Sequence, residues 1–112
     1  AAARAYTQGV QELVALSTPV AAVGGRYASH LRHDGKRLRE GIEEAVAIGE
    51  RAKLPVHVFH VKVTGQQNFG RMQEVVAIVE AARGRGVRVT ADVYPYVASS
   101  TSLTATLPQW VM

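Results

Sequence analysis

Residues 36–63 read KRLREGIEEAVAIGERAKLPVHVFHVKV and predict a helix followed by a buried strand. In residues 36–53, apolar side chains recur at helical spacing on one stripe, and charged side chains occupy the other faces. Asp34 is the expected N-cap of this helix, and Pro55 is expected to end it and open the strand. Residues 56–63 carry apolar side chains on both sides of their alternation, which indicates a strand whose sheet is covered on both faces.

The same helix-then-strand pattern occurs on both sides of this stretch. We expect a strand at residues 26–30, a helix at 70–83 and a third strand at 87–93. Residues 7–23 also have helical spacing, with a kink or a second short helix expected at Pro19. Strands that alternate with helices predict a parallel sheet joined by right-handed crossovers, so we expect an α/β fold.

Two similar segments lie at the ends of the first two strands. HLRHDG (residues 30–35) and HVKVTG (residues 60–65) both read His, apolar residue, cation, two further residues and Gly. His30 and His60 are thirty residues apart, which is the length of one helix-and-strand unit. Each histidine falls at the C-terminal end of its expected strand, and Asp92 falls at the matching point of the third strand.

This placement has a chemical consequence. In a closed β/α barrel the active site is built at the C-terminal ends of the strands, and neighbouring strands lie about 4.8 Å apart. His30 and His60 at equal heights would therefore both reach one ion, and imidazole nitrogen is a common zinc ligand. Alternation also places Arg32 and Lys62 on the faces of these histidines, where a cation would serve an anionic substrate group. The spacing leaves open whether the histidines bind metal or form structural hydrogen bonds.

The other candidate residues give weaker signals. His57 alternates away from His60, so we expect it to point toward the helix layer or solvent, and His33 lies in a loop. We expect neither to be a metal ligand. The phenol of Tyr94 would either donate a hydrogen bond to a developing oxyanion or pack against the rim of the sheet. Residues 99–104 are rich in Ser and Thr and are expected to form a loop.

Composition restricts the possible classes of protein. The 112 residues are 47% hydrophobic and 20% charged, which is typical of one small globular domain or part of a larger one. The sequence has no apolar run long enough to cross a bilayer, no signal-peptide pattern and no cysteine, so we expect a cytoplasmic protein without membrane contacts. The net charge is +4, but the basic residues are spread beside glutamates along helices, so nucleic-acid binding is not expected.

Four segments share a pattern with one known family: GGRYASHLR (24–32), HVK (60–62), TADVYPY (90–96) and ASST (98–101). Together they resemble the N-acyl-D-amino-acid deacylases, or D-aminoacylases, of the amidohydrolase superfamily. The resemblance runs from about Thr7 to Trp110. It implies a zinc-dependent hydrolase that removes the acyl group from a small N-acyl-D-amino acid. It also implies that residues 1–112 are a single fragment of a parallel (β/α)8 TIM-type barrel, about three units near strands 5 to 7.

The resemblance implies roles for individual residues. His30 and His60 correspond to the zinc ligands of the fifth and sixth strands. The family also uses a His-x-His pair, a cysteine ligand and a catalytic aspartate on the last strand, and none of these is located in this sequence. The general base is therefore expected outside this stretch, and Asp92 receives no catalytic role.

The resemblance also implies a substrate-binding group. Lys62 corresponds to the residue that binds the substrate carboxylate. Tyr94 is the first candidate for the tyrosine near the scissile carbonyl, and Tyr96 is the second. Arg32 fits the family pattern and is grouped with these residues, without an assigned function.

Other interpretations remain open from the sequence. Within the same class, the substrate would be a dipeptide or a cyclic amide. In another class, the chain is a non-catalytic module with structural histidines, or a phosphate-binding barrel segment that uses Arg32 and Lys62. The isolated fragment is expected to be inactive. The unpaired edges of three strands predict contact with the remainder of a barrel or self-association.

Overall fold

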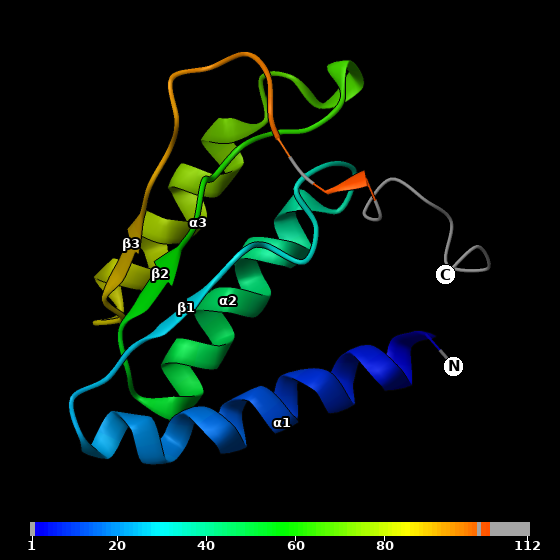
Figure 1. Ribbon diagram of the computed structural model, residues 1–112. Helices are drawn as coiled ribbons and strands as arrows, with labels where there is room; N and C mark the ends of the chain where they lie inside the picture. Colours follow the sequence, from blue (N-terminus) through cyan, green and yellow to red (C-terminus); the bar gives the residue numbers. More distant parts are fainter. Residues whose placement is uncertain (1, 101, 104–112) are drawn as a thin grey trace.

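The computed structural model describes residues 2–100, 102 and 103, and the side chains from residue 9 onward. Its helices and strands alternate as predicted (Figure 1). In chain order they are α1 (Ala2–Ala22), β1 (Tyr27–Ser29), α2 (Leu38–Ala52), β2 (Val56–Val58), the 3-10 helix η1 (Gln66–Asn68), α3 (Met72–Gly84) and β3 (Val89–Ala91). Thr101 and Thr104 of the expected Ser/Thr-rich loop, and Trp110 at the end of the resemblance, lie outside the described residues.

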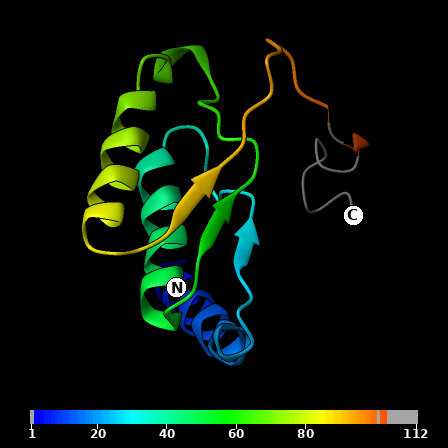
Figure 2. The same ribbon diagram turned by 90° about the vertical axis from the view of Figure 1, so that its left-hand side faces the viewer.

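The three strands form one parallel sheet in the order β1-β2-β3. Tyr27 pairs with Val56, and Val56 pairs with Val89 on its other side. Helices α2 and α3 cover the same face of this sheet, while α1 packs against α2 (Figure 2). The α/β class and the parallel sheet are therefore confirmed. The prediction that both faces of the sheet are covered is wrong for the described residues, because no helix packs on the second face.

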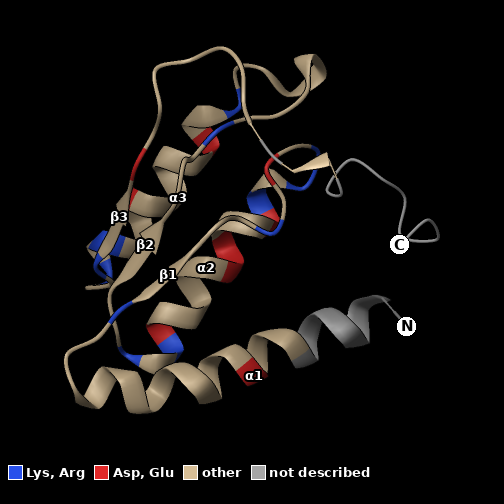
Figure 3. Cartoon of the chain, viewed as in Figure 1, with Lys and Arg blue, Asp and Glu red and all other residues tan. Residues whose placement is uncertain are grey.

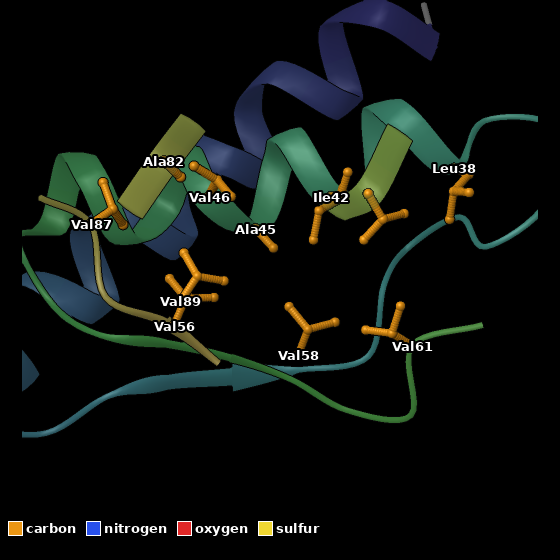
Figure 4. Close-up of a cluster of buried hydrophobic side chains, with 11 residues drawn as sticks. Leu38, Ile42, Ala45, Val46, Val56, Val58, Val61, Ala82, Val87 and Val89 are labelled. Atoms are coloured by element: carbon orange, nitrogen blue, oxygen red, sulfur yellow. The ribbon is translucent and has the colours of Figure 1, made fainter. Parts of the chain in front are cut away.

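The hydrophobic core lies between α2, α3 and the sheet. On α2, Leu38 and Ile42 are fully buried in one cluster with Val56 and Val58 of β2, and Ile42 lies over Val58 (Figure 4). Burying one such side chain stabilises the fold by about 1.5–3 kcal/mol. Gly49 allows α2 to approach the sheet closely, because a Cβ atom there would overlap the side chain of Val56. The apolar stripe seen in the sequence thus fixes how α2 lies on β2.

The strands are shorter than predicted. The expected strand at 56–63 ends at Val58, because the chain turns at Phe59 and His60, where His60 has a φ of 37°. Some ladder bonds continue beyond the regular strand. The N–H of Phe59 donates to the carbonyl of Ser29 at 3.0 Å, and the N–H of Val61 donates to the carbonyl of Asp92 at 2.8 Å.

The start of α2 differs from the prediction. Arg37 occupies the N-cap position and makes no side-chain capping bond, so the expectation that Asp34 caps this helix is wrong. Asp34 instead forms an ion pair with Lys62, which competes for the same carboxylate. At the other end, Lys53 has a left-handed φ of 57° and its N–H bonds to the carbonyl of Gly49, a common helix ending.

Helix α1 continues without a break through Pro19, so the expected second helix near this proline is not formed. Thr18, directly before the proline, donates its hydroxyl to the carbonyl of Val14, one turn earlier in the helix, at 2.8 Å. None of the helices among the described residues combines the length and apolar character needed to span a bilayer.

Candidate metal and substrate site

The C-terminal ends of the three strands bring His30, His60 and Asp92 to one edge of the sheet. His30 directly follows β1, Asp92 directly follows β3, and His60 lies two residues after β2. The Nδ1 atom of His30 faces the Nε2 atom of His60, and the ring centroids are 4.4 Å apart. Two ring nitrogens from neighbouring strands therefore converge, as their spacing in the sequence suggested.

His60 lies in a turn that Asp92 stabilises from the neighbouring strand. A left-handed conformation costs a residue other than glycine about 1–2 kcal/mol. The backbone N–H of His60 donates to Oδ1 of Asp92 at 2.7 Å. The backbone N–H of Asp92 donates to the carbonyl of Val58 at 3.1 Å, and its carbonyl accepts from Val61 at 2.8 Å. Three hydrogen bonds from one residue thus offset the cost of the turn.

His57 lies on the open face of the sheet, in register with Ala28 and Thr90. Its Nδ1 is 2.8 Å from Oγ1 of Thr90, and its Nε2 is 2.8 Å from Oδ2 of Asp92. Of the two directions predicted for His57, the helix layer is wrong, because the ring lies on the face that no described helix covers, and the solvent side agrees with this position. The turn at Phe59 breaks the alternation on which that prediction depended. The pairing register of β2 with β3, which places His57 beside Thr90, is the signal that would have found this contact.

The two aspartates of the site have lowered pKa values for different reasons. For Asp92, the hydrogen bond from the backbone N–H of His60 is the largest cause that lowers the pKa, followed by the bond to His57. For Asp34, burial acts to raise the pKa, but the hydrogen bond and charge of Lys62, with a bond from Thr64, outweigh it. Both carboxylates are therefore ionised at neutral pH.

Lys62 and Tyr94 lie beside His60 at a hollow of about 540 Å³, whose wall also includes Phe69 and Tyr96. The Nζ atom of Lys62 is 2.8 Å from Oδ2 of Asp34 and 3.1 Å from Nδ1 of His60. The rings of Tyr94 and His60 are 6.4 Å apart. The structure therefore brings Lys62 and Tyr94 next to His60, and Tyr96 to the same hollow.

Arg32 lies apart from this hollow and binds helix α2. Its Nε atom is 3.0 Å from both carboxylate oxygens of Glu44, and its Nη2 atom is 2.8 Å from one of them. The side chain of Glu44 is only 6% exposed, while that of Arg32 is 44% exposed. This bidentate geometry uses the guanidinium to neutralise a buried carboxylate. The contact indicates a structural function for Arg32, and its place among the substrate-binding residues stays a prediction.

Elsewhere, charged residues of both signs lie along α2 and α3 and in the segments at their ends (Figure 3). The sequence places arginines beside glutamates, and the structure pairs several of them. The ion pairs are Arg37 with Glu40, Arg39 with Glu43, Arg71 with Glu74, and Arg85 with Glu50.

The donor set at the histidine pair fits part of a zinc site. Neutral imidazole nitrogens are common zinc ligands, and a catalytic zinc takes about three protein ligands. Among the described residues, no group of three or more His, Cys, Asp or Glu side chains is arranged to hold a metal ion. His30 and His60 would therefore supply two ligands, and further ligands would come from outside this part of the structure.

Comparisons with known proteins point to one family, although no protein-family model matches the chain. A D-aminoacylase from Alcaligenes xylosoxydans xylosoxydans is 44% identical over 102 residues, which is 91% of this chain and 20% of the relative. An N-acyl-D-glutamate deacylase from the same organism is 35% identical over 92 residues, or 82% of this chain and 19% of the relative.

Solved structures agree. A crystal structure of D-aminoacylase, described as defining a novel subset of amidohydrolases, matches 80% of this chain and 19% of its own with a TM-score of 0.76 and 39% identity. N-acyl-D-glutamate deacylase from Bordetella bronchiseptica, complexed with zinc and a phosphonate inhibitor, matches 78% of this chain and 18% of its own with a TM-score of 0.75 and 33% identity. The chain thus spans about a fifth of the length of these relatives. In sequence and in fold, it corresponds to one segment of the N-acyl-D-amino-acid deacylases.

Proposed function

We propose that this chain is part of a zinc-dependent amidohydrolase that removes the acyl group from N-acyl-D-amino acids. In this proposal the chain supplies about three units, near strands 5 to 7, of a parallel TIM-type barrel. Three parallel strands with helices on one face, and candidate ligands at their C-terminal edge, support this architecture. The edge strands β1 and β3 would pair with the remainder of the barrel.

The observation that carries the proposal is the convergence of Nδ1 of His30 and Nε2 of His60 beside Lys62. These nitrogens would hold the zinc, which lowers the pKa of a bound water and polarises the amide carbonyl. An imidazole that binds metal through Nε2 carries its proton on Nδ1. Nδ1 of His60 would then no longer accept a hydrogen bond from Lys62, and the ammonium would keep its bond to Asp34.

Lys62 and Tyr94 would bind the substrate. The ammonium of Lys62 lies on the wall of the hollow, where it would pair with the α-carboxylate of the amino acid. The phenol of Tyr94 would donate a hydrogen bond to the oxygen of the scissile carbonyl as negative charge develops on it. A carboxylate outside this stretch would accept the proton of the attacking water and pass it to the leaving amine.

The alternative of a phosphate-binding segment has less support. It requires Arg32 and Lys62 to bind an anion, yet Arg32 is bonded to the buried carboxylate of Glu44. A phosphate at Arg32 would have to displace this carboxylate. Arg32 also lies outside the residues that line the hollow.

The test uses the full-length protein that contains this chain. We expect the purified protein to contain zinc and to hydrolyse N-acetyl-D-amino acids in preference to the L enantiomers. His30→Ala and His60→Ala should each lower zinc affinity and activity by at least about 100-fold, the upper end of the loss expected when an outer-shell partner of a metal site is removed. Val56→Ala, on the helix face of β2, controls for loss of stability.

Three results would contradict the proposal. Full activity of zinc-free protein would exclude the metal site. Zinc-containing protein that cleaves only dipeptides or cyclic amides would show that the substrate is one of these amides and not an N-acyl-D-amino acid. Absence of both zinc binding and hydrolysis of any of these amides would support a non-catalytic module with structural histidines.

A further inference from the structure

The metal-facing orientation of His60 depends on an unfavourable backbone conformation. His60 and Lys53 are the described residues other than glycine with positive φ. Lys53 ends a helix, where this conformation is common, but His60 lies between a strand and a loop. In a relaxed conformation the Cα–Cβ bond of His60 would point in another direction, and its ring would leave Nδ1 of His30.

Asp92 is the neighbour that opposes this relaxation. Its carboxylate Oδ1 accepts the N–H of His60 at 2.7 Å, and its backbone bonds to Val58 and Val61 on both sides of the turn. The side chain of Asp92 therefore adds a specific bond to the residue whose backbone is unfavourable. None of these bonds is made to the imidazole ring.

His57 holds the carboxylate of Asp92 in place. Its Nε2 is 2.8 Å from Oδ2, the carboxylate oxygen that does not bind His60. Thr90 fixes the opposite side of the same ring, with Oγ1 2.8 Å from Nδ1. The Thr90 hydroxyl also lies 3.3 Å from the carbonyl of Val56. When Nδ1 of His57 donates its proton to Oγ1 of Thr90, the hydroxyl can therefore donate its own proton to this carbonyl.

We propose that Asp92, oriented by His57, is a positioning residue that holds the left-handed turn at His60 and so aims its Nε2 atom at the metal position shared with His30. This inference rests on the proposed function, because it assumes that the two histidines bind zinc. Asp92 acts through the backbone of a ligand and is itself no ligand. The conservative change Asp92→Asn therefore keeps the essential contact, since its amide oxygen accepts the same N–H and its NH₂ group donates to Nε2 of His57.

The experiment measures zinc affinity of the full-length protein by chelator competition, together with the visible spectrum of the cobalt(II)-substituted protein. Asp92→Ala should weaken zinc binding by about 10–100-fold, as loss of a supporting partner does at other metal sites. It should also change the cobalt spectrum. Asp92→Asn should restore both readouts close to wild type. Val56→Ala should lower thermal stability while keeping zinc affinity, because it removes packing on the other face of β2.

A second variant decides the question if Asp92→Ala does not fold. His57→Phe keeps an aromatic ring beside Phe59, whose centroid is 5.3 Å from that of His57, but removes both hydrogen bonds. It should weaken zinc binding relative to the wild-type protein and change the cobalt spectrum.

Each outcome bears on one claim. Wild-type zinc affinity and an unchanged cobalt spectrum in Asp92→Ala, or in His57→Phe where that variant decides, would overturn the positioning function. An equal loss in Asp92→Asn and Asp92→Ala would assign Asp92 a charge-dependent or direct ligand function instead. An equal loss in Val56→Ala would reduce the effect to general destabilisation. Failure of the wild-type protein to bind zinc would refute the proposed function itself, before any variant is compared.

Discussion

The ammonium of Lys62 lies 2.8 Å from the carboxylate of Asp34, so the loops that follow β2 and β1 are joined at the edge of the candidate site. The carbonyl of Asp34 also accepts the N–H of Thr64 at 2.7 Å. Arg71, at the start of α3, reaches back to the carbonyl of Lys36 at 3.2 Å. The position of Lys62 thus depends on residues about thirty positions earlier in the chain.

Asp34→Asn should lower stability at neutral pH and have little effect in strong acid. The pKa of Asp34 is lowered in the folded protein, because the bond and charge of Lys62 outweigh the effect of burial. Its stabilisation is therefore fully present above the unfolded pKa of about 3.9 and is lost as the pH falls through the lower folded value. Thermal unfolding followed from pH 7 to pH 2.5 checks this, with a difference of at most about 1 kcal/mol for a half-exposed pair. A stability difference between the two proteins that stays constant across this pH range would contradict a contribution from the ionised Asp34 carboxylate.

Lys62→Met should raise the KM for N-acyl-D-amino acids by about 10–100-fold, because a hydrogen bond to a charged group contributes about 1.5–3 kcal/mol. Lys62→Arg keeps the positive charge and should lose less. The matched substrate is an N-acyl amine without a carboxylate, for which KM should be similar in all three proteins. An equal effect on both substrates would show that Lys62 acts on the histidine pair rather than on the carboxylate.

Arg32→Met should affect stability more than substrate binding. It leaves the carboxylate of Glu44, whose side chain is 6% exposed, without its bidentate partner. Loss of one partner of a buried ion pair lowers the free energy of unfolding by about 3–5 kcal/mol. Because Arg32 is half-exposed, we expect a loss of about 3 kcal/mol or less. Glu44→Gln should cost less, because Arg32 remains hydrated. A large rise in KM at unchanged melting temperature would restore Arg32 to the substrate-binding group.

Gly49→Ala should destabilise the fold by about 1–3 kcal/mol, because its Cβ would overlap Val56 and force α2 away from β2. Gly84→Ala is the control. It lies at the end of α3, and a Cβ there meets no atom within 4 Å. The control should leave stability unchanged or raise it by about 0.5–1 kcal/mol, the usual gain from replacing a helical glycine. Equal melting temperatures for the two variants would contradict the packing described.

Much of the fold follows from local patterns in the sequence. The apolar stripe on residues 36–53 and the valines of residues 56–58 predicted both the elements and the face they share. Because parallel strands end at one edge, the matched positions of His30 and His60 also predicted that their side chains meet.

The rest of the site depends on contacts between strands. The turn at His60 is stabilised by Asp92, thirty-two positions later, so no local pattern marks the end of β2. The same turn shifts the alternation and hides the contact of His57 with Asp92. Asp34 has the composition of a helix cap, yet Lys62 takes its carboxylate. The local preference of Asp34 for a helix cap was therefore overridden by the charge of Lys62, which comes from the next helix-and-strand unit.

Zinc binding by His30 and His60 is tested most directly by a crystal structure of the zinc-loaded full-length protein, with anomalous differences measured at the zinc edge. We expect a zinc peak about 2.0–2.1 Å from both Nδ1 of His30 and Nε2 of His60. A fully occupied zinc bound elsewhere, with neither of these nitrogens in its coordination sphere, would contradict the proposed metal site.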